Sequence, residues 1–295
     1  MRIAALDMGG TAIKWGVWDG ERLVDCGECP SLASEGGPVL LERAKGVLRE
    51  MGPFEAIGIS TAGEVDDRTG QITSSPVHIP DYAGMHVGEM LRNEFNVPVA
   101  VENDANAAAL GEFCVGAMRG EPDFILATYG TGIGGAVVEG GKVRHGLAFS
   151  AGSFGKIITH PECLDAESIP AGRYESFAST TALVQRVQRI RPELSNGREI
   201  FAQKDDPVIA AEIRAWIHEI AIGLVTLAYT LSPRFMVLGG GVMQQPELVA
   251  AISEEVKRYV EPRFYGVGIV ASELGNDAGV IGAAYLAQQL LEAGI

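Results

Sequence analysis

Three glycine-rich turns stand in this sequence at points where a chain can wrap a phosphate group. Each follows a short apolar run that predicts a buried strand. Glycine there lets several backbone N–H groups approach phosphate oxygens with no side chain between them. A single turn of this kind is more often a plain hairpin than a phosphate-binding loop. Three of them in one chain favour a nucleotide-binding site. Their residues are Asp7, Gly9, Gly10 and Thr11; Gly130, Thr131, Gly132, Gly134 and Gly135; and Gly239, Gly240 and Gly241.

Neither common nucleotide fingerprint fits these turns. The chain has no Gly-x4-Gly-Lys-Ser/Thr sequence, and no Gly-x-Gly-x-x-Gly opens a first long helix with an acidic residue after it. The sequence therefore predicts a nucleotide-binding fold that is neither a P-loop nor a Rossmann fold.

Two acidic residues lie where they can act on the phosphates of a bound nucleotide. Asp104, in Glu102-Asn103-Asp104, follows an apolar strand and precedes an alanine-rich helical stretch, so Asn103 or Asp104 caps that helix. A carboxylate in that position can also act as the base for a hydroxyl that attacks the γ-phosphate. Asp7, at the end of the first strand, suits a Mg²⁺ ion held largely through water, or caps its own turn.

The elements that position these residues alternate along the chain. The first two glycine-rich turns share one order of strand, tight turn, strand and hairpin, which predicts a duplicated domain. Helical spacing marks residues 40–51, 87–95, 106–114, 179–191, 207–231, 246–260 and 276–291, with strands between them. This alternation predicts an α/β architecture. We place a small domain at 1–112, joined by the C-terminal helix 277–295, and a large domain at 113–276.

Composition excludes several classes of protein. The formal net charge of -15 over 295 residues argues against a generic binder of nucleic acid or anionic membrane. The longest apolar stretch, 220–231, is shorter than the roughly twenty residues of a membrane span. The chain starts directly in a strand-like run with no secretory signal. Four cysteines are too few for a disulfide scaffold, and the spacing of Cys26 and Cys29 is interpreted as incidental. We expect a cytoplasmic protein.

Taken together and in this order, the motifs resemble those of the ROK family of bacterial sugar kinases and repressors, over essentially the whole chain. The resemblance implies a two-domain actin/hexokinase-like fold built on duplicated ribonuclease-H-like halves, with ATP and Mg²⁺ in the interdomain cleft. It implies phosphoryl transfer to a hexose 6-hydroxyl, with Asp104 as the base, and with Asn103 and Gly63 at the sugar. The glycine-rich turns and Lys14 are assigned to ATP, and relatives are commonly homodimers.

The sequence departs from the family pattern at two places. Family kinases usually carry Glu-x-Gly-His where this chain has Ser153-Phe154-Gly155-Lys156, so Ser153 and Lys156 are expected at the sugar instead. The usual three-cysteine zinc segment retains only Cys163, with His160 nearby, which predicts no structural zinc. Its terminal glutamate survives as Glu175, a carboxylate for sugar hydroxyls.

Three segments resemble most the zinc-free branch of N-acetylmannosamine kinases: residues 60–66, 79–84 and 175–183. A zinc-free β-glucoside kinase branch, which shares the missing cysteines, is second. Ser153 in place of glutamate enlarges the pocket and favours a substituted ring over plain glucose. A family repressor needs an additional N-terminal helix-turn-helix, for which no room precedes residue 7. A sugar-binding protein that has lost catalysis is a further alternative, against which the retained Asp104 and the three turns speak.

Overall fold

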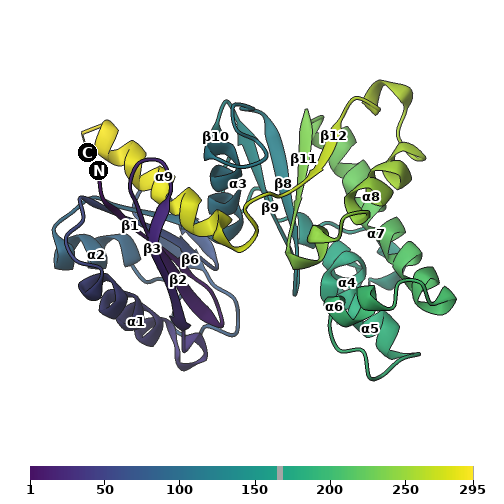
Figure 1. The fold of residues 1–295 in the computed structure, drawn as a ribbon, viewed down its shortest axis with the longest axis horizontal. Helices are drawn as coiled ribbons and strands as arrows, with labels where there is room; N and C mark the ends of the chain where they lie inside the picture. The colour runs from purple at the N-terminus through teal and green to yellow at the C-terminus, as the bar shows by residue number, and fades with distance from the viewer. Residues whose placement is uncertain (165–168, 295) are drawn as a thin grey trace. The chain divides into compact units, whose positions relative to one another are not determined.

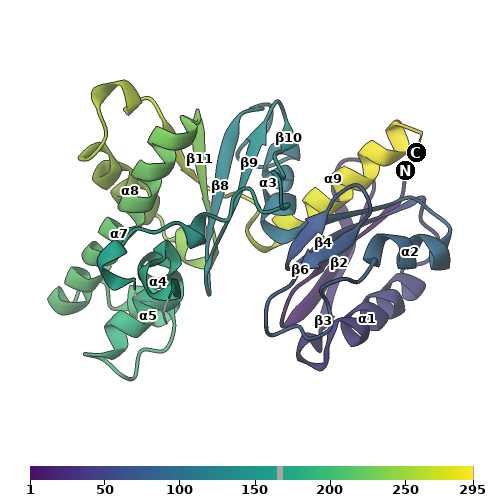
Figure 2. The same ribbon diagram turned by 180° about the vertical axis from the view of Figure 1, so that it is seen from behind.

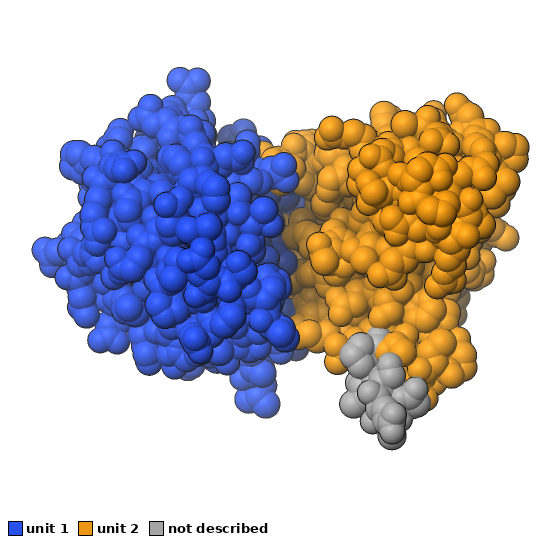
Figure 3. Space-filling model, turned by 90° about the horizontal axis from the view of Figure 1, so that it is seen from below, with its two compact units in different colours: residues 1–122, 141–151, 276–295 blue, residues 123–140, 152–275 orange. Residues whose placement is uncertain are grey.

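The computed structural model describes residues 1–164 and 169–294 of the chain. It divides into two compact units (Figure 3). Unit 1 comprises residues 1–122, 141–151 and 276–295, and unit 2 comprises residues 123–140 and 152–275. Each unit is a mixed α/β structure with its own sheet and its own hydrophobic core.

Unit 1 is built on a sheet ordered β3-β2-β1-β4-β7. Its strands are β1 (Ile3–Met8), β2 (Ala12–Trp18), β3 (Leu23–Pro30), β4 (Ala56–Thr61) and β7 (Val99–Asn103). The first three pair antiparallel, whereas β1 with β4 and β4 with β7 pair parallel. The parallel strands end at the same edge of the sheet, which brings the residues after β1, β4 and β7 together.

Helices cover both faces of this sheet (Figure 1). On one face, α1 (Gly37–Glu50) and α2 (Val87–Phe95) pack on alternate strand residues such as Leu6 and Ile59. The other face carries α9 (Ala278–Glu292), which packs against β1 and β4 and against α3 (Asp104–Cys114). A Cβ at Gly58 would lie 2.1 Å from Ala283 O, so glycine is needed for this close approach of helix and sheet.

Shorter elements complete unit 1. The hairpin of β5 (Glu64–Asp66) and β6 (Gln71–Ser74) follows β4, and β10 (Lys142–Val143) lies in the segment 141–151, beside α3. The chain thus returns to unit 1 twice after residue 122, once through this segment and once through α9. The view from behind shows α9 along the sheet and α1 with α2 on its other side (Figure 2).

Four strands of a five-stranded sheet belong to unit 2, in the order β9-β8-β11-β12. Its strands are β8 (Phe124–Tyr129), β9 (Ile133–Glu139), β11 (Phe235–Gly239) and β12 (Gly268–Ala271). The strands β8 and β9 form an antiparallel hairpin, and β11 lies parallel to both β8 and β12. The ends of β8 and β11 are therefore neighbours, so the second and third glycine-rich turns lie side by side.

The helices of unit 2 surround a core centred on α7 (Pro207–Leu231). Trp216 of α7 is fully buried, and its indole N–H donates to the carbonyl oxygens of Ala178 and Ser179. The other helices are α4 (Tyr174–Ala178), α5 (Thr180–Gln188), α6 (Gly197–Ala202) and α8 (Leu248–Lys257). In the part of the chain that the structure describes, no helix combines the length and the apolar character that crossing a membrane requires.

Short 3-10 helices connect many of these elements. They are η1 (Ala33–Glu35), η2 (Phe154–Lys156), η3 (Pro161–Cys163), η4 (Ile169–Gly172), η5 (Gly241–Gln244), η6 (Pro262–Phe264) and η7 (Gly275–Asp277). Two of them, η2 and η5, directly carry residues that the sequence assigns to the sugar and to ATP.

Candidate active site

The first glycine-rich turn joins β1 to β2 in unit 1. Its backbone closes on itself because Gly9 N–H donates to Ala12 O at 3.0 Å. Gly10 and Thr11, at the tip of the turn, are exposed. The exposed His78 lies against this tip, since a Cβ at Gly10 would come within 2.8 Å of His78 Nε2. The tip of the turn therefore exposes the backbone of Gly10 together with Thr11, the combination of backbone N–H groups and a hydroxyl that suits a phosphate-binding loop.

Asp7 ends up half-buried beside this turn. Ser60 Oγ, at the same level of the parallel neighbour β4, donates to Asp7 Oδ1 at 2.6 Å. Lys14 faces Asp7 across the antiparallel pair of β1 and β2. Burial raises the pKa of Asp7, although the Ser60 hydrogen bond and the Lys14 charge oppose the shift. A desolvated carboxylate whose Oδ2 accepts no hydrogen bond from the described residues is the kind of hard oxygen donor that suits Mg²⁺.

Asp104 opens helix α3 at the end of β7. The preceding Asn103 is the N-cap, and its Oδ1 accepts hydrogen bonds from Ala105 N and Asn106 N at 3.0 and 3.2 Å. Asp104 Oδ1 accepts from Ala105 N at 2.8 Å and from Asn103 Nδ2 at 3.0 Å. No described residue is hydrogen-bonded to Asp104 Oδ2. The sequence thus placed Asp104 correctly at a strand end and a helix start, and the fold fixes one of its oxygens while the other stays available.

The Asp104 carboxyl has an unusual pKa for an aspartate. The Asp104 residue is exposed to solvent, yet many protein atoms lie around its carboxyl. This desolvation, together with the nearby charge of Asp7, raises the pKa to about 6, against the opposing hydrogen bonds from Ala105 and Asn103. A carboxylate that titrates near neutrality is well matched to accept and release a proton.

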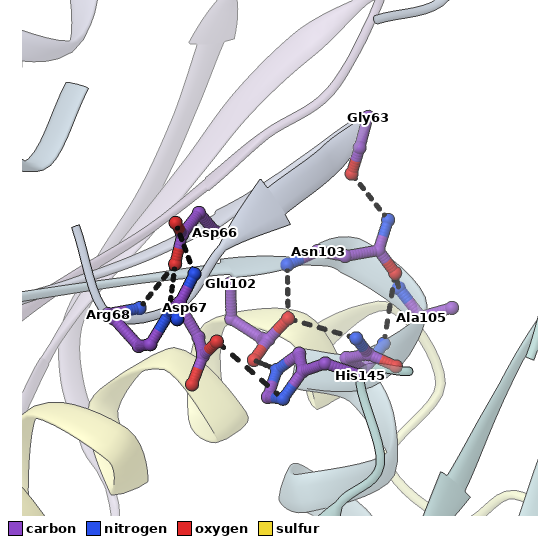
Figure 4. Close-up of polar contacts among 9 residues, drawn as sticks. Gly63, Asp66, Asp67, Arg68, Glu102, Asn103, Ala105 and His145 are labelled. Atoms are coloured by element: carbon purple, nitrogen blue, oxygen red, sulfur yellow. Dashed lines mark hydrogen bonds and ion pairs between the residues drawn. The ribbon is translucent and has the colours of Figure 1, made fainter. Parts of the chain in front are cut away.

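Asn103 also ties in the turn that contains Gly63. Its Nδ2 donates to Gly63 O at 2.9 Å (Figure 4). Gly63 has φ 104°, and a Cβ there would lie 2.4 Å from Ser74 O, so no other residue fits this turn. The Nδ2 and the Oδ1 of Asn103 each make two hydrogen bonds. The Asn103 side chain therefore links the Gly63 turn, Asp104 and the first turn of α3.

Sequence reasoning missed two residues behind this arrangement, Glu102 and His145. Glu102 is 2% exposed, and its carboxylate faces the first turn of α3 on one side and His145 on the other (Figure 4). His145 Nε2 donates to Glu102 Oε2 at 2.7 Å. Only the position of Glu102 next to Asn103 hinted at a role, and no pattern in the sequence connects it with His145.

The second and third glycine-rich turns meet in unit 2. Gly130, Thr131 and Gly132 join β8 to β9, and Gly130 N–H donates to Gly132 O at 3.0 Å. Gly240, after β11, has φ 104° and approaches so closely that a Cβ would lie 2.2 Å from Tyr129 O. The start of α5 supports the same turn, because Thr180 N–H donates to Gly130 O at 3.0 Å. Sequence reasoning did not assign α5 to this site.

Glu175 lies against the second turn as well. A Cβ added to Gly132 would come within 2.6 Å of Glu175 Oε2, and one added to Gly155 within 2.9 Å. The segment of Ser153 and Lys156 is anchored here because Phe154 is buried against Gly135 of β9. Ser153 is half-buried and precedes η2, and Lys156 is exposed at its end. Unit 2 thus brings Glu175, the second turn and the segment 153–156 together.

The segment in which the sequence resemblance predicts no zinc site is held by contacts of His160 with two glutamates. His160 Nδ1 lies 2.8 Å from Glu162 Oε1, its Nε2 lies 2.9 Å from Glu219 Oε2, and its ring stacks on Phe177. Cys163 is exposed and free. Residues 165–168 of this segment lie outside the described residues. Among the residues that are described, no three or more histidine, cysteine or acidic side chains gather as metal ligands.

A comparison with known proteins identifies the family. The model of the ROK family matches residues 3–290. The chain belongs to the ROK family. It is 34% identical over 295 residues to a β-glucoside kinase of Listeria monocytogenes, covering 97% of each chain. Glucokinases of several bacteria also match along most of their length.

Solved structures of ROK proteins share the fold. A Listeria monocytogenes protein described as a candidate N-acetylmannosamine kinase matches with a TM-score of 0.89 and 30% identity, over 98% of this chain and 99% of that one. A Streptomyces griseus ROK glucokinase, solved with glucose and AMPPNP, matches with a TM-score of 0.84 and 31% identity, over 98% and 100%. The predicted actin/hexokinase-like fold is confirmed. The predicted enzyme class is confirmed too: this ROK protein is an ATP-dependent sugar kinase.

Proposed function

We propose that this ROK kinase phosphorylates the 6-hydroxyl of a hexose or hexosamine, with Asp104 as the general base. The observation that carries the proposal is the state of the Asp104 carboxyl. Its Oδ1 is fixed by Ala105 N–H and Asn103 Nδ2, its Oδ2 accepts no bond from the described residues, and its pKa is raised to about 6. Such a group is ionised at neutral pH and still basic enough to take the hydroxyl proton.

Phosphoryl transfer depends mainly on the alignment of the sugar hydroxyl with the γ-phosphate and on neutralisation of the phosphate charge. The base accepts the hydroxyl proton late in this reaction. As the sugar oxygen approaches the γ-phosphate, Asp104 Oδ2 accepts its proton, and Oδ1 stays bonded to the backbone of α3. General base catalysis of this kind contributes about 10²- to 10⁴-fold to the rate. The bonds from Ala105 and Asn103 hold the carboxylate in place, so little reorganisation is needed during transfer.

The three glycine-rich turns are proposed to bind the phosphates of ATP through backbone N–H groups. Gly9, Gly10 and Thr11 would do so in unit 1, with Lys14 adding a positive charge next to Asp7. In unit 2 the same role falls to Gly130, Thr131, Gly132 and Gly134, with Gly239, Gly240 and Gly241. Asp7 fits Mg²⁺, which neutralises phosphate charge when bound; the chain itself orients Asp7 through Ser60.

For the sugar, we propose contacts from Gly63 and Asn103 in unit 1 and from Ser153, Lys156 and Glu175 in unit 2. All four bonding positions of the Asn103 amide are engaged within the protein, so a sugar hydroxyl has to share one of them. Glu175, beside Gly132 and Gly155, supplies an acceptor for hydroxyls.

The favoured substrate is N-acetylmannosamine. Ser153 replaces a longer, charged acceptor, and its hydroxyl makes no hydrogen bond to the described residues, which leaves room for a ring substituent. The second candidate is a β-glucoside, with its bulk at the anomeric carbon. The full-length similarity to a β-glucoside kinase supports this second candidate.

A coupled ADP-release assay decides between these substrates. It compares N-acetylmannosamine, glucose, N-acetylglucosamine and a β-glucoside such as cellobiose, each with ATP and Mg²⁺. We expect the highest kcat/KM with N-acetylmannosamine. A best rate with the β-glucoside replaces the first candidate by the second, and no ADP release with any sugar contradicts the proposed reaction.

A further inference from the structure

Glu102 is a buried carboxylate in a place where an unpaired charge is costly. Its side chain is 2% exposed at the end of β7, the outermost strand of the unit 1 sheet. Burial of an ionised carboxylate is tolerated only when partners satisfy its oxygens and its charge. Three groups do so among the described residues: Asn103 N–H, Asn106 Nδ2 and His145 Nε2.

Two of these bonds hold the turn from which Asp104 projects. Glu102 Oε1 accepts from Asn103 N at 2.8 Å and from Asn106 Nδ2 at 2.9 Å. Asn106 is itself buried, and its Oδ1 accepts no hydrogen bond from the residues that the structure describes. The Asn106 side chain is thus oriented so that Nδ2 donates to Glu102, although Oδ1 then has no hydrogen-bond partner among the described residues. This indicates that the bond to Glu102 sets the orientation of the Asn106 amide.

The third hydrogen bond joins the Glu102 carboxylate to a side chain that can carry the opposite charge, His145. His145 comes from the segment 141–151, far from Glu102 in the sequence, and its Nε2 lies 2.7 Å from Glu102 Oε2. The Glu102 hydrogen bond raises the pKa of His145, opposed by partial burial and aided by the charges of Asp67 and Asp66. Arg68, Arg92 and Lys142 line the same cavity of about 470 Å³, but the bond to Glu102 comes from His145.

Hydrogen bonds and the covalent frame of Asn103 therefore connect His145 with the proposed base. The connection passes from His145 Nε2 to Glu102 and from Glu102 to Asn103 N–H (Figure 4), and the Asn103 side chain then donates through Nδ2 to Asp104 Oδ1. Each step is a single short bond, and Asn103 and Asp104 are adjacent at the start of α3. We therefore expect a shift of Glu102 to alter the placement of both side chains.

We infer that His145 is a positioning residue for phosphoryl transfer: as the charged partner of Glu102 it fixes the Asn103–Asp104 turn in the geometry that catalysis needs. The inference rests on the proposed role of Asp104 as the base. His145 itself touches neither sugar nor ATP in this account. Its loss leaves Glu102 a buried carboxylate with no cation bonded to it, and the rearrangement of Glu102 that follows disturbs the turn.

The test compares His145→Ala, His145→Gln and the control His218→Ala in the full-length protein. His218 also pairs with a glutamate, Glu255 at 3.0 Å, but on α7 and α8 of unit 2. Steady-state rates are measured with ATP, Mg²⁺ and the best sugar of the ADP-release panel, and thermal melts report folding. His145→Ala is expected to lower kcat about ten- to hundredfold, since small misplacements of catalytic groups cost that much.

Two further readouts separate positioning from mere stability. KM for ATP should stay within about twofold in His145→Ala, because the glycine-rich turns are untouched. His145→Gln, which retains a donor for Glu102 Oε2 without the charge, should recover part of the lost kcat. His218→Ala should retain wild-type kcat even if its melting temperature falls as far as that of His145→Ala.

The inference is overturned if folded His145→Ala keeps kcat within about twofold of the wild type. It is also overturned if His145→Gln, equally folded, is no better than His145→Ala. Asp104→Asn, assayed in parallel, keeps the two proposals apart. If Asp104→Asn is inactive and His145→Ala is fully active, only the positioning role fails; if Asp104→Asn is active, the proposed base fails.

Discussion

The carboxylates of Asp7 and Asp104 lie close enough for the charge of Asp7 to raise the pKa of Asp104. They end neighbouring parts of one sheet, Asp7 on β1 and Asp104 directly after β7, separated by β4 with its Ser60. One is proposed for Mg²⁺ and the other for the sugar hydroxyl. Their proximity within unit 1 places the proposed metal ligand beside the proposed base, as transfer of a phosphoryl group to a hydroxyl requires.

The first prediction concerns the base itself. Asp104→Asn keeps a hydrogen-bond acceptor for Ala105 N–H but cannot accept a proton, so kcat should fall at least about a hundredfold. ATP binding, measured by calorimetry, and the thermal melt should remain close to those of the wild type. Turnover near the wild-type value would remove Asp104 from the mechanism.

The second prediction concerns the pH dependence of the reaction. Because Asp104 must be ionised to act as a base, kcat/KM should rise with pH through a midpoint near the free-enzyme pKa of about 6. In Asp7→Asn the repelling charge is gone, which lowers the pKa of Asp104, so the midpoint should move to lower pH even though the rate falls. Profiles measured at subsaturating ATP and Mg²⁺ report the free enzyme. An unchanged midpoint in Asp7→Asn would contradict the coupling of the two carboxylates.

A third prediction follows from the pairing of His145 with Glu102. The pKa of His145 is raised above its ordinary value of 6.5, so the folded state favours the imidazolium form. The stability from this shift is complete below pH 6.5 and is lost as the pH rises through the raised folded-state pKa. The difference in unfolding free energy between the wild type and His145→Gln should therefore shrink from about pH 6 to about pH 9. Urea unfolding across this range measures it, and a difference that grows with pH has the wrong sign.

The fourth prediction is that the purified protein carries no stoichiometric zinc. His160 is engaged by Glu162 and Glu219, and Cys163 is the one cysteine that remains of the family's zinc segment. Chelators should have no effect beyond removing the Mg²⁺ that accompanies ATP. Elemental analysis that finds one zinc per chain would contradict this prediction and point to His160 and Cys163 as ligands.

The fifth prediction concerns the choice of sugar. A pocket that is only larger than its substrate discriminates weakly between sugars. A pocket discriminates strongly when the wrong sugar leaves one of its buried polar groups without a hydrogen bond. Restoring the family residues with Ser153→Glu and Lys156→His should therefore shift the preference from N-acetylmannosamine towards glucose, seen as the ratio of the two kcat/KM values. A wild-type protein that prefers glucose by about tenfold, with a double variant that changes little, would show that Ser153 does not open the pocket.

The sequence by itself determined what is encoded locally. The strand and tight turn at Asp7–Thr11, the helix that begins at Asp104 and the helix over 207–231 follow from apolar spacing, glycine and capping residues within a few positions of one another. The motifs that identify the family are of the same kind, because a phosphate-binding turn is a continuous piece of chain. Some helix ends were misplaced, as for the stretch 179–191, where α5 ends at Gln188.

Only the tertiary structure decided which distant residues share an environment. The pKa of Asp104 is raised by desolvation and, beyond that, by the charge of Asp7, which is remote in the sequence and near only because both strands end at one edge of the sheet. His145 meets Glu102 because the chain returns to unit 1 through residues 141–151, a path that no local pattern encodes. Burial, too, belongs to the folded chain: the sequence shows a glutamate at 102, but packing against α3 and His145 makes it a buried charge that needs a partner.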